Sequence, residues 1–300
     1  MKNPKFLKIH CINHLRTGYG KEDVSVEKFL ETVIEYNDKG KAIKEEHFLS
    51  DNELETYIIN QYDERTLLTS SAQYDGQHEL IQKADFYYDD YENIVRQDNY
   101  FGENSSVYST QYLYNKGLLI KQDSYDEGEF VFTEKEFFYN EKKLLVEQVE
   151  FDEDGNKKYV IENEYNDDSF VVKRVRDEIM EKDRRTFVYE YDQNGNKIKD
   201  LIYDYDNILI SKVYYAYNEQ KQLLVKEDED LDRYLKTINT FEGENVIKTE
   251  VFDKKNKLLS WNEYTYDDNA LVATMKQYIP DETDTNEFRP LVEYEYDRVY

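Results

Sequence analysis

Few residues in this chain have the chemistry of a catalytic or metal site. All four histidines lie in the first 78 residues of the sequence, at His10, His14, His47 and His78. The segment from His10 to His14, with Cys11 inside it, is the one compact group of soft metal ligands. Zinc sites need three or four such ligands, and no second cluster supplies the others. We therefore expect a partly buried cysteine beside solvent-facing imidazoles here, and no metal.

Carboxylates are abundant but gather where the chain should turn. The segment Asp152-Glu153-Asp154-Gly155-Asn156 superficially resembles a calcium loop, but it lacks the length and the distal glutamate of an EF-hand. We interpret it as a hydrogen-bonded turn. A glycosidase-like pair would need a cleft, and the chain contains no G-x-S-x-G, P-loop or G-x-G-x-x-G motif. The sequence predicts a protein without catalytic residues, cofactor or metal.

One acidic run is a candidate binding site. It comprises Glu227, Asp228, Glu229 and Asp230. Such a run could dock a basic partner, or it could be a solvated loop. Both interpretations remain open at this point.

The net charge limits the classes of partner. The chain carries 66 acidic and 39 basic residues, a formal charge of −27. A field of this sign disfavours nucleic acids and anionic membranes. It favours a basic protein partner, whose encounter it would steer. The alternative is that the charge keeps an exposed sheet soluble.

The remaining bulk features indicate an intracellular protein. The single cysteine, Cys11, excludes an internal disulfide. Residues 1–8 are charged and lack the apolar stretch of a signal peptide. No run approaches the length of a membrane span. We expect a cytoplasmic location.

The organising feature of the sequence is an aromatic residue followed by Asn, Asp or Glu, most often a Tyr-Asn or Tyr-Asp pair, repeated along the chain. Successive pairs are 24 to 30 residues apart, and six of the ten spacings are 26. The aromatic anchors are Tyr36, Tyr62, Tyr88, Tyr114, Tyr139, Tyr165, Tyr191, Tyr217, Phe241, Tyr266 and Tyr296. A fixed period of this size indicates one supersecondary unit copied along the chain. Such arrays usually serve binding.

Each period holds two strands and two turns. Phe187, Tyr189 and Tyr191 alternate and therefore share one face of a strand. Asp192–Gly195 has turn chemistry, and a second strand follows. Connections this short allow only antiparallel pairing. The second turn lacks its aromatic residue near Asp177 and Glu229, where we expect looser hairpins.

We therefore predict an all-β fold for residues 26–300: an elongated antiparallel meander of about 20 strands, curved or spiralling because twist accumulates across a large sheet. Tyrosine accounts for 30 residues, and its polar tip tolerates water, which suits a thin, wet layer. Two segments interrupt the pattern. Residues 1–25 carry no anchor and are expected to cap the first strand. Residues 279–290, with Pro280 and Pro290, are expected to be a loop insertion.

The repeats resemble the YD repeats of the RHS/YD superfamily. The best matches are Tyr189–Asp192 with Gly195 and Ile198, Tyr36–Gly40 with Ile43, and Tyr294–Asp297. The resemblance covers residues 30–300 and implies a strip of β-hairpins. In that family such strips often spiral into shells around toxic polypeptides. An RHS core signature and a toxin domain are both missing from these 300 residues, so we expect the strip without encapsulation.

Together these features predict a non-enzymatic binding protein. The resemblance implies a protein-binding scaffold, adaptor or immunity-type module in a bacterial toxin or secretion system. The alternative is a carbohydrate-binding module that uses exposed tyrosines. An enzyme would need a cleft that gathers carboxylates from several turns.

Overall fold

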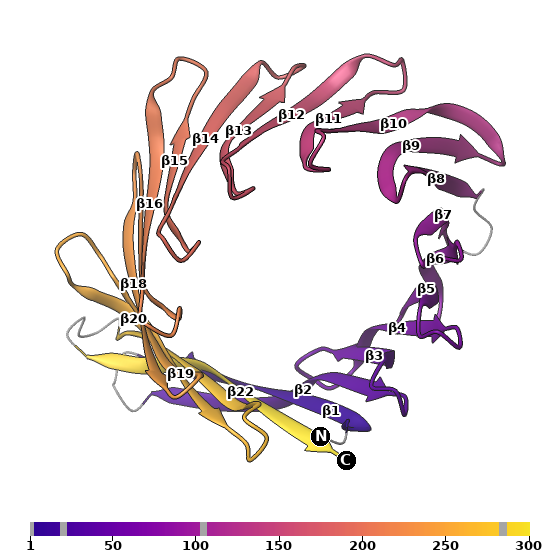
Figure 1. Cartoon of the computed structure of the whole chain (residues 1–300). Helices are drawn as coiled ribbons and strands as arrows, with labels where there is room; N and C mark the ends of the chain where they lie inside the picture. The colour runs from indigo at the N-terminus through magenta and orange to yellow at the C-terminus, as the bar shows by residue number, and fades with distance from the viewer. Residues whose placement is uncertain (1–2, 19–22, 103–106, 282–286) are drawn as a thin grey trace. The chain divides into compact units, whose positions relative to one another are not determined.

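The structure, a computed structural model, describes residues 3–18, 23–102, 107–281 and 287–300. These residues form 22 β-strands, and the described ranges contain no helix. Paired strands run antiparallel, and where the connection is described, strands adjacent in sequence are joined by short turns (Figure 1). The predicted all-β fold with antiparallel strands is confirmed.

Among the described residues, no helix exists that is long and apolar enough to cross a membrane.

The chain divides into two compact units. Unit 1 comprises Met1–Asp85, Phe101–Asn104 and Lys236–Tyr300, and unit 2 comprises Phe86–Tyr100 and Ser105–Leu235. A few strands end across these limits, and each strand is assigned below to the unit that holds most of it.

Unit 1 contains both ends of the chain. Its strands are β1 (Phe6–Arg16), β2 (Val24–Tyr36), β3 (Ala42–Phe48), β4 (Leu54–Tyr62), β5 (Leu68–Asp75), β6 (Leu80–Tyr88), β18 (Tyr234–Glu242), β19 (Asn245–Phe252), β20 (Leu258–Tyr266), β21 (Val272–Pro280) and β22 (Phe288–Val299). Sequential strands pair within each of the two segments. The two segments are joined by pairing between β1 and β22, from Phe6↔Val299 to Asn13↔Val292.

The pairing of β1 with β22 corrects one feature of the predicted meander. An open strip would leave its first and last strands unpaired, whereas here each covers the edge of the other. Strand β1 lies within residues 1–25, the segment expected to cap the first strand, and it forms a full ladder with β2. Of the predicted insertion, 279–280 and 288–290 are strand, and 282–286 lie outside the described residues. Mutual edge pairing removes the exposed backbone groups that a cap would otherwise cover.

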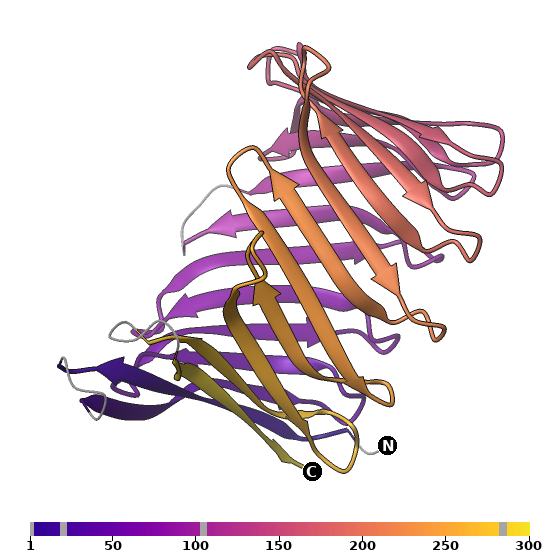
Figure 2. The same ribbon diagram turned by 90° about the vertical axis from the view of Figure 1, so that its left-hand side faces the viewer.

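Unit 2 is a succession of antiparallel strands in sequence order (Figure 2). Its strands are β7 (Ile94–Phe101), β8 (Tyr108–Asn115), β9 (Leu118–Asp126), β10 (Glu129–Tyr139), β11 (Leu145–Phe151), β12 (Lys157–Tyr165), β13 (Val171–Glu178), β14 (Asp183–Tyr191), β15 (Lys197–Tyr203), β16 (Leu209–Tyr217) and β17 (Leu223–Asp230). Each pairs with the next in sequence.

The residue after the tyrosine anchor builds a five-residue turn. The Asp192 carboxylate accepts hydrogen bonds from the backbone N–H of Asn194 at 2.8 Å and of Asn196 at 2.9 Å. The backbone closes the same turn, since Asp192 N–H donates to the Asn196 carbonyl and Gly195 N–H donates to the Asp192 carbonyl. Gly195 adopts φ +79°, a left-handed conformation that glycine reaches without strain. The sequence pattern therefore encodes a self-supporting turn.

The anchor tyrosines link each repeat to the one before it. Tyr191 donates its hydroxyl hydrogen bond to the carbonyl of Val171 at 2.9 Å, 20 residues earlier. The same bond, always across 20 residues, is made by Tyr62 to Ala42, Tyr114 to Ile94, Tyr139 to Leu119, Tyr165 to Leu145, Tyr217 to Lys197 and Tyr266 to Val246. Each hydroxyl satisfies a carbonyl just past the preceding turn. The hydroxyl, as well as the ring, therefore holds successive hairpins together.

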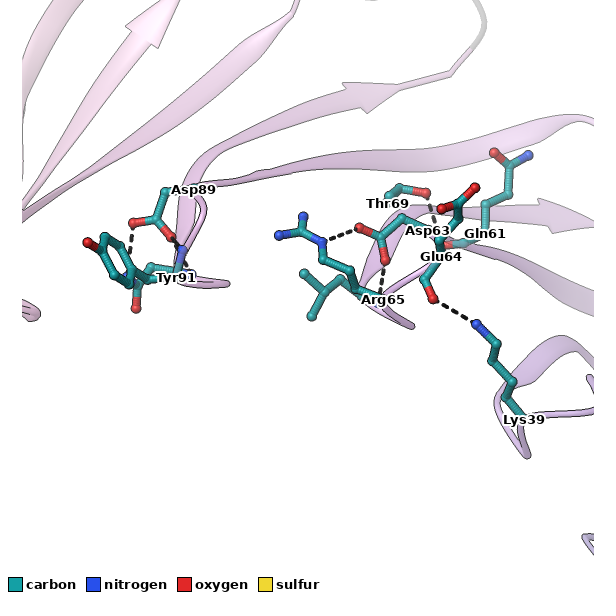
Figure 3. A network of polar contacts seen from close by, with 10 residues as sticks. Lys39, Gln61, Asp63, Glu64, Arg65, Thr69, Asp89 and Tyr91 are labelled. Carbon is teal, nitrogen blue, oxygen red and sulfur yellow. Dashed lines mark hydrogen bonds and ion pairs between the residues drawn. The ribbon is translucent and has the colours of Figure 1, made fainter.

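Lysine side chains reinforce this link on the surface of some turns. In unit 1 the Lys39 ammonium donates to the carbonyl of Glu64 at 2.8 Å, while Arg65 contacts Asp63 within its own turn (Figure 3). Lys221 makes the equivalent bond to the Asn194 carbonyl in unit 2, at 3.3 Å. Such exposed contacts add little energy individually. They align turns whose geometry the anchors have already set.

The core is thin. Among the described residues, only six apolar side chains are buried, the deepest being Val149 at 1% exposure. Every residue of β3, β15 and β19 is half-buried. A single sheet layer has no second layer to bury its faces, so amphipathic tyrosine replaces much of the aliphatic core.

Substitutions at Tyr191 should separate the ring from the hydroxyl. Tyr191→Ala removes a packed ring and should lower the free energy of unfolding by about 3 kcal/mol. Tyr191→Phe leaves the Val171 carbonyl without its donor and should lower it by about 1 kcal/mol. Urea unfolding of both variants measures the difference. A phenylalanine variant as stable as the wild type would show that the hydroxyl bond contributes nothing.

Two glycines in equivalent turns provide a matched test of packing between repeats. Gly195 and Gly155 share φ +79°, but a Cβ at Gly195 would lie 2.8 Å from Phe170 Cζ, whereas nothing lies within 4 Å of one at Gly155. Gly155→Ala should cost about 1 kcal/mol from backbone strain alone. Gly195→Ala should cost more, because Phe170 must also move. Equal losses in thermal unfolding would rule out the Phe170 contact as a constraint.

Candidate functional site

The histidine and cysteine group near the N-terminus does not form a joint site. Alternation along β1 places Cys11 on one face and His10 and His14 on the other. Cys11 is buried, and burial raises the pKa of its thiol. His10 lies 3.4 Å from the Asp297 carboxylate. No group of three or more metal-ligating side chains occurs within the part of the chain that the structure describes.

The segment resembling a calcium loop is a repeat turn. The Asp152 carboxylate accepts from the backbone N–H of Asp154 at 3.1 Å and of Asn156 at 2.8 Å, and from the Asn156 side chain at 3.2 Å. These bonds, led by the Asn156 backbone N–H, hold the pKa of Asp152 below its usual value. The carboxylate of Asp152 therefore organises its own turn.

One arrangement missed by sequence reasoning has the order of a nucleophile, a base and an acid. Thr32 Oγ1 lies 3.3 Å from His47 Nδ1, and His47 Nε2 lies 3.2 Å from Glu45. Adjacent strands β2 and β3 bring the three together through the Thr32↔His47 pair. Thr32 is only 7% exposed, so a substrate carbonyl has no access to its hydroxyl. The contacts among Thr32, His47 and Glu45 are better understood as satisfied polar interactions within the sheet.

The acidic run Glu227–Asp230 ends strand β17 and does not form one patch. Its side chains alternate between the two faces of the sheet. Glu229 pairs with Lys212 at 2.9 Å and Asp228 with Lys226 at 3.1 Å. Asp230 accepts from the N–H groups of Asp232 and Arg233 and so holds the following turn. Most of these charges are used within the sheet, and docking by this run stays a prediction.

A cluster of exposed apolar side chains lies at one edge of unit 2. We call Met180, Tyr205, Ile208 and Leu231 the tip patch. They are 66%, 73%, 57% and 75% exposed, respectively. They stand at the tips of three consecutive hairpins, β13–β14, β15–β16 and β17–β18. Adjacent hairpins are two strands apart, about 9 to 10 Å.

Hydrogen bonds fix the backbone at these tips. At β15–β16 the Asp204 carboxylate accepts from Ile208 N–H at 2.8 Å, as in the standard repeat turn. The other two tips follow the positions where the second aromatic residue is missing, and their turns differ from the standard one. At β13–β14, Glu181 N–H donates to the Glu178 carbonyl, and at β17–β18, Asp230 N–H donates to the Arg233 carbonyl. The apolar side chains therefore project from ordered turns.

The tip patch could have been detected in the sequence. Residues at the centre of the other turns are mostly polar, whereas Tyr205 and Ile208 stand inside the turn Asp204–Ile208, and Leu231 stands between two aspartates. An apolar residue inside a turn segment is the signal, because a turn tip has no core to bury it.

A cavity of about 660 Å³ adjoins the tip patch beside Met180. It is lined by Glu150, Lys158, Tyr159, Arg176, Glu178, Met180 and Glu181. The Arg176 guanidinium lies over the Tyr159 ring at 5.1 Å and pairs with Glu178. Lys158 pairs with Glu150 at 3.3 Å. The cavity thus has an aromatic and thioether wall and a rim of charged groups.

Grooves between consecutive repeat turns form a second kind of hollow. One, of about 680 Å³, lies between the turns at Asn166 and Asp192, and an equivalent groove lies between the turns at Asp89 and Asn115. In the first, the Phe170 ring stacks on Tyr191 with centroids 4.8 Å apart. The ring and the tyrosine hydroxyl in this groove both take part in packing between hairpins, whereas Tyr91, which lines the second groove, is 86% exposed.

Comparisons with known proteins add little to this geometry. No family model matches the chain, and a search of curated proteins finds no match. Among solved structures, a porin-like protein from Bacteroides uniformis aligns with 99% of this chain and 97% of its own at 8% identity, with a TM-score of 0.36. The TcdB2-TccC3-TEV structure aligns with 84% of this chain at 10% identity, with a TM-score of 0.35. The Photorhabdus luminescens Tc holotoxin pore aligns with 90% at 10% identity, with a TM-score of 0.26.

The shares of the matched chains differ widely. The alignments span only 19% of the TcdB2-TccC3-TEV chain and 23% of the holotoxin chain.

Alkaline pH should destabilise the fold through its tyrosines. Burial raises the pKa of anchors such as Tyr62, Tyr139 and Tyr191, and raises that of Tyr294 to about 12. Unfolded tyrosines titrate near pH 10, so the unfolded chain loses its protons first. Stability should be complete below about pH 10 and should fall as the pH rises towards 12.

Urea midpoints measured between about pH 8 and about pH 11, beside a titration of tyrosinate absorbance, would follow this loss. A midpoint that stays constant over this range would contradict the raised pKa values.

Proposed function

We propose that this chain is a non-enzymatic protein-binding module and that the tip patch of unit 2 is its binding surface. The observation that carries the proposal is the exposure of Met180, Tyr205, Ile208 and Leu231 on three consecutive hairpins. Single exposed apolar residues are ordinary, but a contiguous set marks an interaction site.

The composition of the tip patch supports a protein partner. Aromatic residues and methionine are enriched at protein interfaces. Tyr205 offers a large contact area with only two rotatable side-chain bonds, so ordering it on binding loses little entropy. Because ordered turns hold these side chains, the surface is formed before the partner arrives. Preorganisation of this kind improves affinity.

The repeat chemistry supports an RHS/YD-type β-strip as the scaffold. The aspartate-held turn explains why Asp or Asn must follow the tyrosine, and the hydroxyl bond explains the tyrosine itself. An adaptor or immunity-type role in a bacterial toxin or secretion system is the form of protein binding that this resemblance favours. We place carbohydrate binding behind it, because anchor hydroxyls and the Phe170 ring already have partners within the sheet.

A partner-binding experiment tests the proposal. Proteins that co-purify with the full chain from its native host would be identified, and the strongest candidate purified and titrated calorimetrically. The double variant Tyr205→Ser with Leu231→Ser should bind that partner at least about tenfold more weakly, a loss of about 1.4 kcal/mol. Glu153→Ser with Asp154→Ser, at the neighbouring polar tip of β11–β12, is the matched control and should bind normally.

Equal affinity of the wild type and the tip variant would remove the tip patch as the binding surface. Circular dichroism of both double variants should show the wild-type sheet, since all four positions are exposed at turns.

A further inference from the structure

We propose that the tip patch receives a basic, amphipathic segment of a partner protein, with one lysine or arginine side chain in the cavity beside Met180. This inference rests on the proposed function and specifies the chemistry of the partner. Three observations lead to it: unpaired carboxylates at the tips, the lining of the cavity, and the apolar surface between them.

The tips present carboxylates that the sheet does not use. Glu181, Asp206 and Asp232 form no ion pair with any residue that the structure describes. These three carboxylates are each adjacent in sequence to Met180, Tyr205 or Leu231, in solvent-exposed turns. Elsewhere in the same unit some acidic groups have a basic partner on the neighbouring strand, as Glu229 has Lys212. A cationic partner would supply the counter-charges that the fold leaves out.

The cavity beside Met180 suits a long cationic side chain. Lysine and arginine bury an aliphatic stem against apolar surface and keep the charged head near polar groups. Met180 offers such a wall beside the Tyr159 ring, which Arg176 already covers on one face. Glu181 also stands among the lining residues and has no ion-pair partner in the described part of the chain. Glu150 and Glu178 already have Lys158 and Arg176 as partners. The lining is net acidic, which disfavours an incoming anion.

The same charges argue against a lipid surface. Apolar side chains at loop tips can also insert into membranes, but anionic headgroups would be repelled by Asp206 and Asp232. The net charge of −27 extends this repulsion to long range. A basic protein surface with exposed aliphatic side chains satisfies both the charge and the apolar area.

Defined peptides test the chemistry directly. A fluorescent peptide of alternating leucine and lysine would be compared with one of alternating leucine and glutamate, by anisotropy with the full chain. We expect the chain to bind the leucine-lysine peptide and not the leucine-glutamate peptide. Asp206→Asn with Asp232→Asn should weaken it at least about tenfold and reduce its salt dependence, because steering charges are lost. Tyr205→Ser with Leu231→Ser should also weaken it, and Glu181→Gln should do so through the cavity.

The matched control removes the same charge from another tip. Glu153→Gln with Asp154→Asn neutralises two exposed carboxylates at β11–β12 in the same unit. This variant should bind the peptide like the wild type. An equal loss in the control would mean that net charge alone attracts the peptide, and the inference would be overturned. Binding of the leucine-glutamate peptide with similar affinity would overturn it as well.

Two further arms separate this inference from the proposed function and from lipid binding. If the purified partner loses affinity for the Tyr205→Ser, Leu231→Ser chain but not for the Asp206→Asn, Asp232→Asn chain, protein binding stands and the basic partner is wrong. If neither variant changes its affinity, both proposals fail. Sedimentation of the chain with vesicles of phosphatidylcholine and phosphatidylserine, abolished by Leu231→Ser, would reassign the tip patch to lipid.

Discussion

The hydrogen bond that seven of the anchor tyrosines donate to a carbonyl 20 residues earlier is the interaction on which the repeat depends. A strand ladder fixes neighbouring strands but does not by itself define how one turn lies against the next. The hydroxyl reaches past the turn and satisfies a backbone group there, while the ring packs against the preceding hairpin. Because the partner is a backbone carbonyl, any residue can occupy that position, so the repeat tolerates a variable sequence around a constant tyrosine.

This constraint divides the molecule into a regular edge and a variable one. Most turns that follow the anchors are held by an aspartate or asparagine, and seven of the anchor tyrosines connect them to the preceding hairpin. The described turns at the opposite edge lack the tyrosine bond. Some of them, such as those at Asp152 and Asp204, keep the aspartate-held form. Two others, near Met180 and Leu231, adopt other hydrogen-bond patterns. Variation without loss of the fold is possible there. Functional side chains concentrate where a scaffold tolerates change, and the proposed binding surface, the tip patch, lies at such turns.

The charged side chains of the protein contribute to its structure as well as to its proposed function. Cross-strand pairs such as Lys199 with Glu190, at 2.8 Å, place opposite charges on the same face of the sheet. Each exposed pair contributes little energy. Like charges also face one another in places, as Glu147 faces Glu162 and Arg176 faces Arg185. Within the described ranges, acidic groups without a basic partner therefore occur on strands as well as at turns and tips. Such groups can repel another sheet edge or attract a basic surface, and the local neighbours of each carboxylate decide which effect operates.

Periodicity alone determined the secondary structure of most of the chain. The alternation around Tyr191 and the turn residues Asp192–Gly195 act over a few positions, so their consequences can be derived without knowledge of the fold. The position of the candidate site could be predicted only in part from the sequence. The acidic run Glu227–Asp230 was visible in the sequence, but strand alternation divides it between two faces, and cross-strand lysines neutralise part of it.

Only the tertiary structure decided which distant segments meet. The pairing of β1 with β22 joins residues nearly the whole chain apart, and no local pattern specifies that partner. The same applies to the tip patch, whose members come from three hairpins and become one surface through strand order. Local sequence sets turns and strand faces because those depend on neighbouring backbone groups. Long-range features depend on contacts between distant segments, and no single segment specifies those contacts. The pairing of β1 with β22 and the positions of exposed side chains from different hairpins are of this kind.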